Sequence, residues 1–409
     1  MDTGQILLSF IGGMVPLAAA AFYLGRRRAL LITAGGARMH SRPQQYGAYV
    51  AAWMALPAIA IGAVAGAGGL LGLRLPAAPY IFALCLAGAA IGCYTALRRV
   101  QPDMRARGAL ERYTEWALLT ASMVSILTTL GIVVSILFEA IRFFNIVSVW
   151  DFITGTNWSP VAHYRPGQET ADSQFGSIPL FAGTFMITAI AMAVALPIGL
   201  LSAVFMSEYA SYKVRTVAKP LLEILAGIPT VVYGFFAAVT VSPFVVQVAN
   251  SVGLDAAYTN ALAPGLVMGI MIIPFISSLS DDVINSVPNS LREGSYGLGA
   301  TKSETIKQVI LPAAFPGIMA AALLGISRAL GETMIVVMAA GLRPNLTLNP
   351  LEDMTTVTVR IVDALTGDQA FDSPETLAAF ALGLVLFVVT LILNLISIIV
   401  IRKFRQNYE

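Results

Sequence analysis

Charged residues are scarce in this sequence. Of its 409 residues, 12% are charged and 57% are hydrophobic, whereas about a quarter of the residues in a typical soluble domain are charged. This composition excludes an ordinary soluble globular domain and predicts a membrane protein.

Residues that commonly build disulfides, metal sites or nucleotide sites are also scarce. The chain has two Cys and two His. Cys85 and Cys93 lie in one apolar segment, and on a helix their spacing corresponds to about 12 Å, which is too long for a disulfide. The sequence contains no G-x-x-x-x-G-K-[ST] loop that could cradle phosphates, so we do not expect this chain to bind ATP. No catalytic residue, cofactor or metal site is predicted, and we expect the chain not to be an enzyme.

Long apolar runs dominate what is present. A helix needs about 20 apolar residues to cross a bilayer, and a membrane span must pair its own backbone groups, which favours helices. The sequence therefore predicts an all-α polytopic membrane protein with about nine transmembrane helices. The nine predicted spans cover residues 5–25, 48–73, 77–97, 116–138, 178–206, 220–249, 261–283, 313–340 and 376–401.

The positions of Lys and Arg predict the orientation. With the N-terminus outside, nineteen of the 25 Lys and Arg residues fall in cytoplasmic stretches and five fall in external ones; the last, Arg328, falls within a predicted span. Because cytoplasmic loops carry the excess of positive charge, we expect a periplasmic N-terminus and a cytoplasmic C-terminus.

The spans divide into two groups. Residues 1–112 contain three spans rich in Gly and Ala, and the sequence does not indicate what this N-terminal extension does. Residues 113–409 contain six spans and two long external loops, at 139–177 and 341–375. We therefore predict a three-span extension followed by a six-helix core.

A polar segment at residues 292–312 lies between the seventh and eighth predicted spans. It is predicted to form two short helices joined at Gly299, where glycine permits a backbone that other residues resist. Thr301 and Glu304 have the spacing of a capping box, which would begin the second helix. Pro312 would end that helix or begin the next span. On these features alone, an ordinary connecting loop is an equal alternative.

This segment resembles the EAA loop of permeases from ABC importers. The residues that carry the resemblance are Glu293, Gly299, Val309, Leu311 and Pro312. The sequence departs from the family at Gly294 and Ser295, where the family usually has two Ala, and at Val309, where Ile is usual. The resemblance implies that the segment, with Ala300 and Thr301 beside the glycine, docks onto a separate ATP-binding cassette ATPase.

The eighth predicted span contains Arg-Ala-Leu-Gly-Glu-Thr at residues 328–333, which is similar to the PstC-type permeases of phosphate importers. Residues 207–210, 219–223 and 226–234 match the same pattern. The resemblance implies an importer of inorganic phosphate in the bacterial inner membrane. Its partners would be two ATPase subunits, a second, PstA-like permease subunit, a periplasmic phosphate-binding protein and the lipid bilayer, with no nucleic acid.

Other functions stay open at this point. Permeases for sulfate, molybdate or tungstate share the EAA loop and are the nearest alternatives. A secondary transporter would more often show interrupted spans at matching positions of two halves, and no such symmetry is evident in the sequence. A membrane anchor or sensor without transport would not need an EAA-type loop.

Arg328 lies within a predicted span. Placing an Arg near the middle of a membrane costs about 2.5–3.5 kcal/mol of free energy, so a structural or functional role is expected for it. Glu332 follows at i+4, so on one unbroken helix the two would share a face. One hypothesis is a structural ion pair within the chain or with the partner permease. The other, which the resemblance favours, is a substrate pathway in which the guanidinium holds the anion. Glu332 would then balance the charge so that the anion is not trapped, and Thr333 is a further pathway residue.

Glu223 is a further pathway candidate, at the cytoplasmic end of the sixth span. Lys219 lies four residues earlier, and an ion pair between the two at the membrane interface is the simpler interpretation. Asp281 and Asp282 close the seventh span, where they are expected to be solvated or to cap the following turn.

Overall fold

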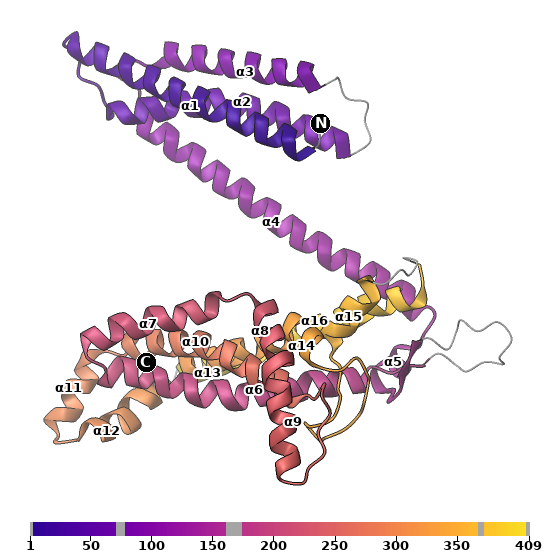
Figure 1. Cartoon of the computed structure of the whole chain (residues 1–409). Helices are drawn as coiled ribbons and strands as arrows, with labels where there is room; N and C mark the ends of the chain where they lie inside the picture. The colour runs from indigo at the N-terminus through magenta and orange to yellow at the C-terminus, as the bar shows by residue number, and fades with distance from the viewer. Residues whose placement is uncertain (1–2, 71–77, 161–173, 367–371, 406–409) are drawn as a thin grey trace. The chain divides into compact units, whose positions relative to one another are not determined.

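The computed structural model describes residues 3–70, 78–160, 174–366 and 372–405 of the chain. It divides into two compact units, Met1–Leu130 and Gly131–Glu409 (Figure 1). Helix α4 (Ala106–Phe144) runs through both this boundary and the predicted one at 112/113. The functional division at residue 112 therefore stays a prediction.

The first unit is built from three helices and the beginning of α4. Helices α1 (Thr3–Ala34) and α3 (Ala78–Arg99) both pack along α2 (Pro43–Leu70). Cys85 and Cys93 lie on α3 and are free thiols, as their spacing predicts.

The second unit contains the remaining elements. Two short strands pair antiparallel, with Trp158 opposite Phe175. The elements in chain order are α5 (Val149–Thr154), β1 (Trp158–Ser159), β2 (Gln174–Phe175), α6 (Ile178–Val204), α7 (Tyr212–Gly227), α8 (Thr230–Phe236), α9 (Ser242–Ser251), α10 (Leu262–Ser286), α11 (Asn289–Gly297), α12 (Lys302–Thr305), α13 (Leu311–Leu330), α14 (Met334–Ala339), α15 (Val357–Thr366) and α16 (Pro374–Arg405), with π-helical turns at Phe205–Tyr209, Ala237–Val241 and Ile306–Ile310.

Eight helical segments in the described part of the chain are long and apolar enough to cross a membrane. They correspond to the second to ninth predicted spans. The first predicted span, 5–25, lies in α1, where the side chains of residues 3–11 are outside the described set. The chain is an all-α, multi-pass membrane protein, as its composition predicts.

Two spans predicted as single helices are interrupted. The predicted span at 220–249 is broken between α7 and α8, where Pro229 forces Ile228 into an extended backbone with ψ of 129°. The predicted span at 313–340 is broken between α13 and α14, across residues 331–333. The prediction of continuous helices was wrong because apolar length sets how far a segment can reach, not whether its backbone is unbroken.

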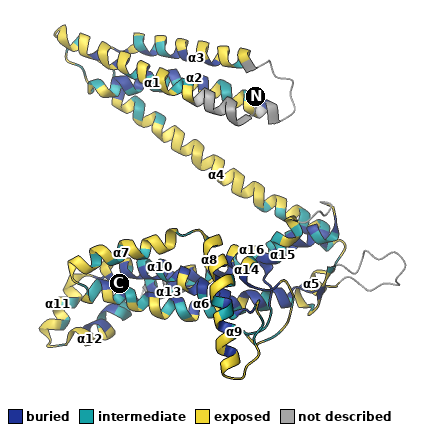
Figure 2. Cartoon of the chain, in the orientation of Figure 1, coloured by how far each residue is buried: buried dark blue, intermediate teal, exposed yellow. Residues whose placement is uncertain are grey.

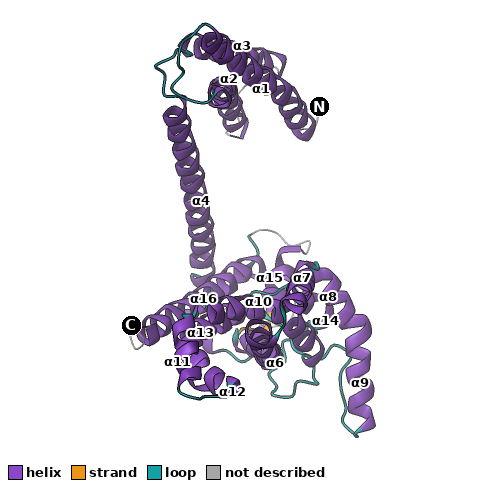
Figure 3. Cartoon of the chain, turned by 90° about the vertical axis from the view of Figure 1, so that its left-hand side faces the viewer, coloured by secondary structure: helices purple, strands orange, loops and turns teal. Residues whose placement is uncertain are grey.

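Helix α10 is the centre of the second unit. Fourteen of its residues are buried, and it packs against both α6 and α13 (Figures 1 and 3). By contrast, α7 and α11 bury no residue in this chain and are largely exposed (Figure 2). The core therefore fixes α10, and other elements are attached to it.

Candidate functional site

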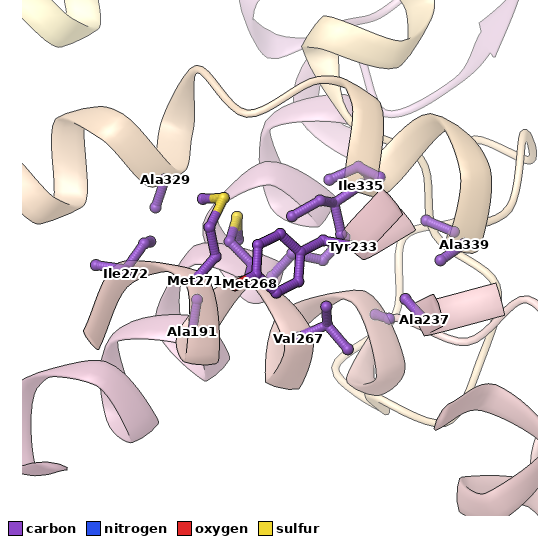
Figure 4. Close-up of a cluster of buried hydrophobic side chains, with 14 of the residues drawn as sticks. Ala191, Tyr233, Ala237, Val267, Met268, Met271, Ile272, Ala329, Ile335 and Ala339 are labelled. Carbon is purple, nitrogen blue, oxygen red and sulfur yellow. The ribbon is translucent and has the colours of Figure 1, made fainter. Parts of the chain in front are cut away.

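The two helix interruptions meet in one packed cluster. Helix α8 approaches α14 so closely that a Cβ on Gly234 would lie 2.9 Å from the Met334 carbonyl oxygen. Tyr233 is buried in the same cluster as Ile335 and Ala329 (Figure 4). Its hydroxyl donates a hydrogen bond of 2.8 Å to the Leu225 carbonyl at the end of α7. The ends of α7 and α13 are thus joined through α8 and α14.

Arg328 lies in the last turn of α13, next to the second interruption. A helix C-terminus favours a cation there. Its guanidinium carbon is 5.6 Å from the centroid of the Phe275 ring on α10, within the range of a cation–π contact. The side chain is exposed in this chain, and among the described residues nothing forms a hydrogen bond or ion pair with it. Its hydrogen-bonding fork is therefore available to a ligand.

Glu332 follows the end of α13 and does not share a helical face with Arg328. Its Oε1 accepts hydrogen bonds from the backbone N of Met334 at 3.1 Å and of Ile335 at 3.5 Å, which caps α14. Within the described part of the chain no ion pair joins Glu332 to Arg328. The expected i, i+4 arrangement was wrong because the helix ends at Leu330.

Thr333 lies half-buried at the start of α14, directly after Glu332. Its hydroxyl donates to the Gly331 carbonyl at 3.3 Å. The hydroxyl of Thr358, at the start of α15, donates to the Glu332 carbonyl at 3.0 Å. The backbone around the interruption is thus held by hydroxyl groups from two elements, and Thr358 is a residue that the sequence did not single out.

Glu223 is exposed on α7, and the expected pair with Lys219 does not form. Instead, the Lys219 ammonium lies 3.0 Å from Asp281 Oδ2 and 3.4 Å from Asp282 Oδ1, both on α10. The hydrogen bond to Asp281 is the main reason that the pKa of Lys219 is raised. A raised pKa means that the pair is fully formed below the ordinary lysine pKa and is lost only as pH rises past the raised value.

Asp281 is the main residue that sequence reasoning missed. We expected a solvated or capping carboxylate, but its side chain is 0% exposed and forms an ion pair with Arg215 at 2.9 Å. A signal was present: an acidic residue inside an apolar run, and two cations spaced i, i+4 on the amphipathic α7. Spacing alone could not show that these belong together, because 62 residues separate Lys219 from Asp281.

The polar segment at residues 292–312 has the predicted local structure. Gly299 has a φ of +87°, a conformation that favours glycine, and Thr301 and Glu304 form the predicted capping box. Pro312 lies in the first turn of α13 and Leu311 is its first residue. Glu293 is exposed on α11, and Ala300 is half-buried beside the glycine.

The same segment is fastened to the rest of the unit by charge. The Arg292 guanidinium lies 3.1 Å from Glu208 Oε1 and donates at 2.8 Å to the Ile284 carbonyl of α10. The Lys302 ammonium lies 4.9 Å from the centroid of the Tyr209 ring. By contrast, Leu298 at the turn is 92% exposed. The turn at Leu298 is therefore an exposed apolar tip, and the contacts of Arg292 and Lys302 anchor the base of the segment on either side of it.

Comparison with known proteins gives a consistent result. Residues 195–406 match the family described as binding-protein-dependent transport system inner membrane component, and residues 13–71 match one described as phosphate ATP-binding cassette transporter. The probable ABC transporter permease protein YqgH of Bacillus subtilis is 37% identical over 252 residues, which is 62% of this chain and 77% of that protein.

A second relative is named as a phosphate transport system permease protein. This protein, PstC of Haemophilus influenzae, is 31% identical over 303 residues, which is 68% of this chain and 91% of the relative. Among solved structures, one chain of a bacterial alginate ABC transporter is 15% identical, with a TM-score of 0.48, and the match covers 72% of this chain and 97% of that one.

Proposed function

This chain belongs to the family of binding-protein-dependent transport system inner membrane components, and we propose that it forms part of the pathway for inorganic phosphate in an ATP-driven importer. The relative from Haemophilus influenzae is named for phosphate transport, which supports this substrate. The chain contributes translocation, while ATP hydrolysis belongs to a separate subunit.

The observation that carries the proposal is the guanidinium of Arg328 beside two broken helices, which forms no hydrogen bond or ion pair with any residue that the structure describes. A planar guanidinium donates in a fork that matches the oxygens of phosphate. Because Glu332 is occupied in capping α14, it does not neutralise Arg328 directly. We therefore assign Arg328 as the anion contact, and Glu332 and Thr333 as the residues that hold the backbone beside it. Glu223 is assigned to the cytoplasmic end of the pathway.

The anchored segment supports one of the proposed partners, the ATPase. Residues 292–312, with Glu293, Gly299, Ala300, Thr301, Leu311 and Pro312, are proposed to dock on the ATPase. The exposed Leu298 is an apolar group that a protein groove would cover. A second permease subunit would complete the pathway, and a periplasmic phosphate-binding protein would deliver the anion.

The proposed orientation places the N-terminus in the periplasm and the C-terminus in the cytoplasm of an inner membrane. Reporter fusions after Arg28, Lys219 and Arg405 should then report the cytoplasm, and a fusion after Gly167 should report the periplasm. A cytoplasmic signal from the fusion after Gly167 would overturn this orientation.

Substrate competition in the assembled importer tests the proposed substrate. The complex is reconstituted in vesicles with its ATPase, partner permease and binding protein, and uptake of labelled phosphate is followed with and without ATP. We expect ATP-dependent uptake that a large excess of sulfate, molybdate or tungstate leaves unchanged. No ATP-dependent uptake of labelled phosphate, together with ATP-dependent uptake of labelled sulfate, molybdate or tungstate in the same vesicles, would transfer the assignment to that oxyanion.

A further inference from the structure

Helix α7 is attached to the second unit in an unusual way. It carries Val217, Leu221 and Ile224, yet none of its residues is buried in this chain. Its neighbour α10 buries fourteen residues. The position of α7 against α10 is therefore not set by an apolar core of its own.

Polar contacts to one buried carboxylate hold the N-terminal half of α7 instead. Both oxygens of Asp281 accept hydrogen bonds from Arg215 Nη2, at 3.1 and 2.9 Å, and Oδ2 also accepts one from Lys219 at 3.0 Å. Asn285, one turn further along α10, donates to Oδ1 at 2.9 Å. The carboxylate is fully satisfied only while Arg215 and Lys219, and hence α7, remain in this position.

The other end of α7 is a bend. Ile228 and Pro229 leave the helical conformation, and the hydrogen bond from Tyr233 to the Leu225 carbonyl crosses the bend. A helix with a bend at one end, a charge cluster at the other and no buried side chain between them can move as a rigid element. A hydrogen-bonded charge cluster favours discrete positions over gradual sliding, because an intermediate position leaves the buried carboxylate unpaired.

We propose that Asp281 is a positioning residue for transport. It holds α7, and Glu223 with it, against α10 in one state of the transport cycle, and the contacts to Arg215 and Lys219 open and re-form in each cycle. Asp281 acts through α7 and does not itself touch the anion. This inference rests on the proposed function, because it names the element that moves during translocation.

Cross-linking tests whether α7 must leave α10. Lys219→Cys and Asp282→Cys are introduced together in a chain with Cys85→Ala and Cys93→Ala, and the two thiols are joined by a short linker that a reductant cleaves. Lys219→Cys removes one contact to Asp281 and leaves that of Arg215, so the reference is the same double variant before linking. We expect linking to lower uptake and binding-protein-stimulated ATP hydrolysis at least about tenfold below this reference, and reduction to return both to it. Linked protein that works at the rate of the unlinked protein would overturn the proposal.

A second ion pair between separate elements provides the matched control. Arg142 on α4 lies 2.9 Å from Asp372, which precedes α16, and nothing in the proposal requires this contact to open. Linked Arg142→Cys/Asp372→Cys should transport at the parental rate. If both linked pairs stop transport equally, the effect is not specific to α7 and the proposal fails.

Substitution of the carboxylate gives an independent readout. Asp281→Asn should lower the maximal uptake rate by about tenfold and leave the KM for phosphate within about twofold, because the anion contact is intact. Exchanging the charges, with Asp281→Arg and Arg215→Asp, should recover part of the rate. A parental maximal rate in Asp281→Asn would contradict the inference.

Failure of the proposed substrate is distinguishable from failure of this inference. A parent complex that hydrolyses ATP but moves no phosphate counts against the substrate. The cross-linking result is then decided by ATP hydrolysis alone.

Discussion

Helix α10 and the two helices attached to its C-terminal end are held by different forces. Helix α10 is packed into the core, with residues such as Ile272 and Ile276 fully buried. Helices α7 and α11 bury no residue in this chain. Charged side chains tie both to neighbouring elements: Arg215 and Lys219 contact Asp281 for α7, and Arg292 contacts Glu208 and the Ile284 carbonyl for α11.

This difference in packing implies that α10 resists displacement more strongly than α7 and α11 do. Apolar packing at interior density resists displacement, because any shift opens a cavity. The carboxylates in the charged contacts, Asp281 and Glu208, are themselves largely buried. These contacts therefore favour discrete positions over gradual displacement, and they part only where water or a partner solvates the separated groups. Helix α11, where the segment proposed to meet the ATPase begins, and α7, which leads to the first interruption, are both on the weakly packed side of this comparison. Later in that segment, Ile306 and Ile310 are buried.

The largest effect should come from the exposed turn at Gly299. A Cβ added at Gly299 would meet no atom within 4 Å beyond its chain neighbours, so the main effect of Gly299→Leu is to oppose the φ of +87°. Gly299→Asn is the matched variant, since Asn tolerates positive φ better than Leu does. We expect Gly299→Leu to reach the membrane and lose phosphate uptake while ATP hydrolysis no longer responds to the binding protein, and Gly299→Asn to keep a substantial part of uptake.

Parental uptake by Gly299→Leu would mean that residues 292–312 are only a connection between spans. It would also mean that the exposed turn at Leu298 and Gly299 has no role in coupling to the ATPase. Membrane abundance of both variants is the necessary control.

The comparison between α10 and α7 sharpens with one isoleucine from each. Ile276→Ala should lower the free energy of unfolding by about 2–4 kcal/mol, because the buried side chain leaves a cavity. Ile224 is 63% exposed, so Ile224→Ala should change the free energy of unfolding by about 0.5 kcal/mol or less. Thermal unfolding of the purified protein measures both. Equal losses would show that α7 is packed as firmly as α10.

The smallest effect concerns a surface carboxylate far from both helices in the sequence. Hydrogen bonds from Thr347, Asn349 and Asn345 lower the pKa of Glu352 from its ordinary value. A lowered pKa contributes stability above the ordinary value, and that contribution is lost as pH falls through the lower value. Glu352→Gln should therefore be slightly less stable than the parent at neutral pH, and the difference should vanish in acid. A difference that grows as pH falls would contradict this sign.

The sequence predicted the local structure of residues 292–312 well, because its signals are local. A glycine at a left-handed turn and a Thr–Glu capping box act within a few residues. The number of apolar spans was also predictable from length and composition, and the spans in the described residues agree with it.

The interruptions and the Asp281 cluster were not predictable in the same way. Pro229 was visible, but a proline inside a span is often repaired by neighbouring helices, and only the packing of α8 on α14 shows that this one ends a helix. The partners of Asp281 come from α7, some sixty residues earlier in the chain. Tertiary contacts of this kind leave no periodic pattern in the sequence.

The most direct test of the account is phosphate uptake by Arg328→Gln, beside the control Arg343→Gln, whose exposed arginine lies in an external loop of the predicted topology. Membrane abundance, co-purification with the ATPase and partner permease, and uptake of labelled phosphate are measured on the same preparations. The account predicts that Arg328→Gln assembles at the parental level and takes up no phosphate, that exchanging Arg328 and Glu332 does not rescue uptake, and that Arg343→Gln transports normally. Normal uptake by Arg328→Gln, or loss of assembly that the exchange repairs, would contradict the assignment of Arg328 as the anion contact.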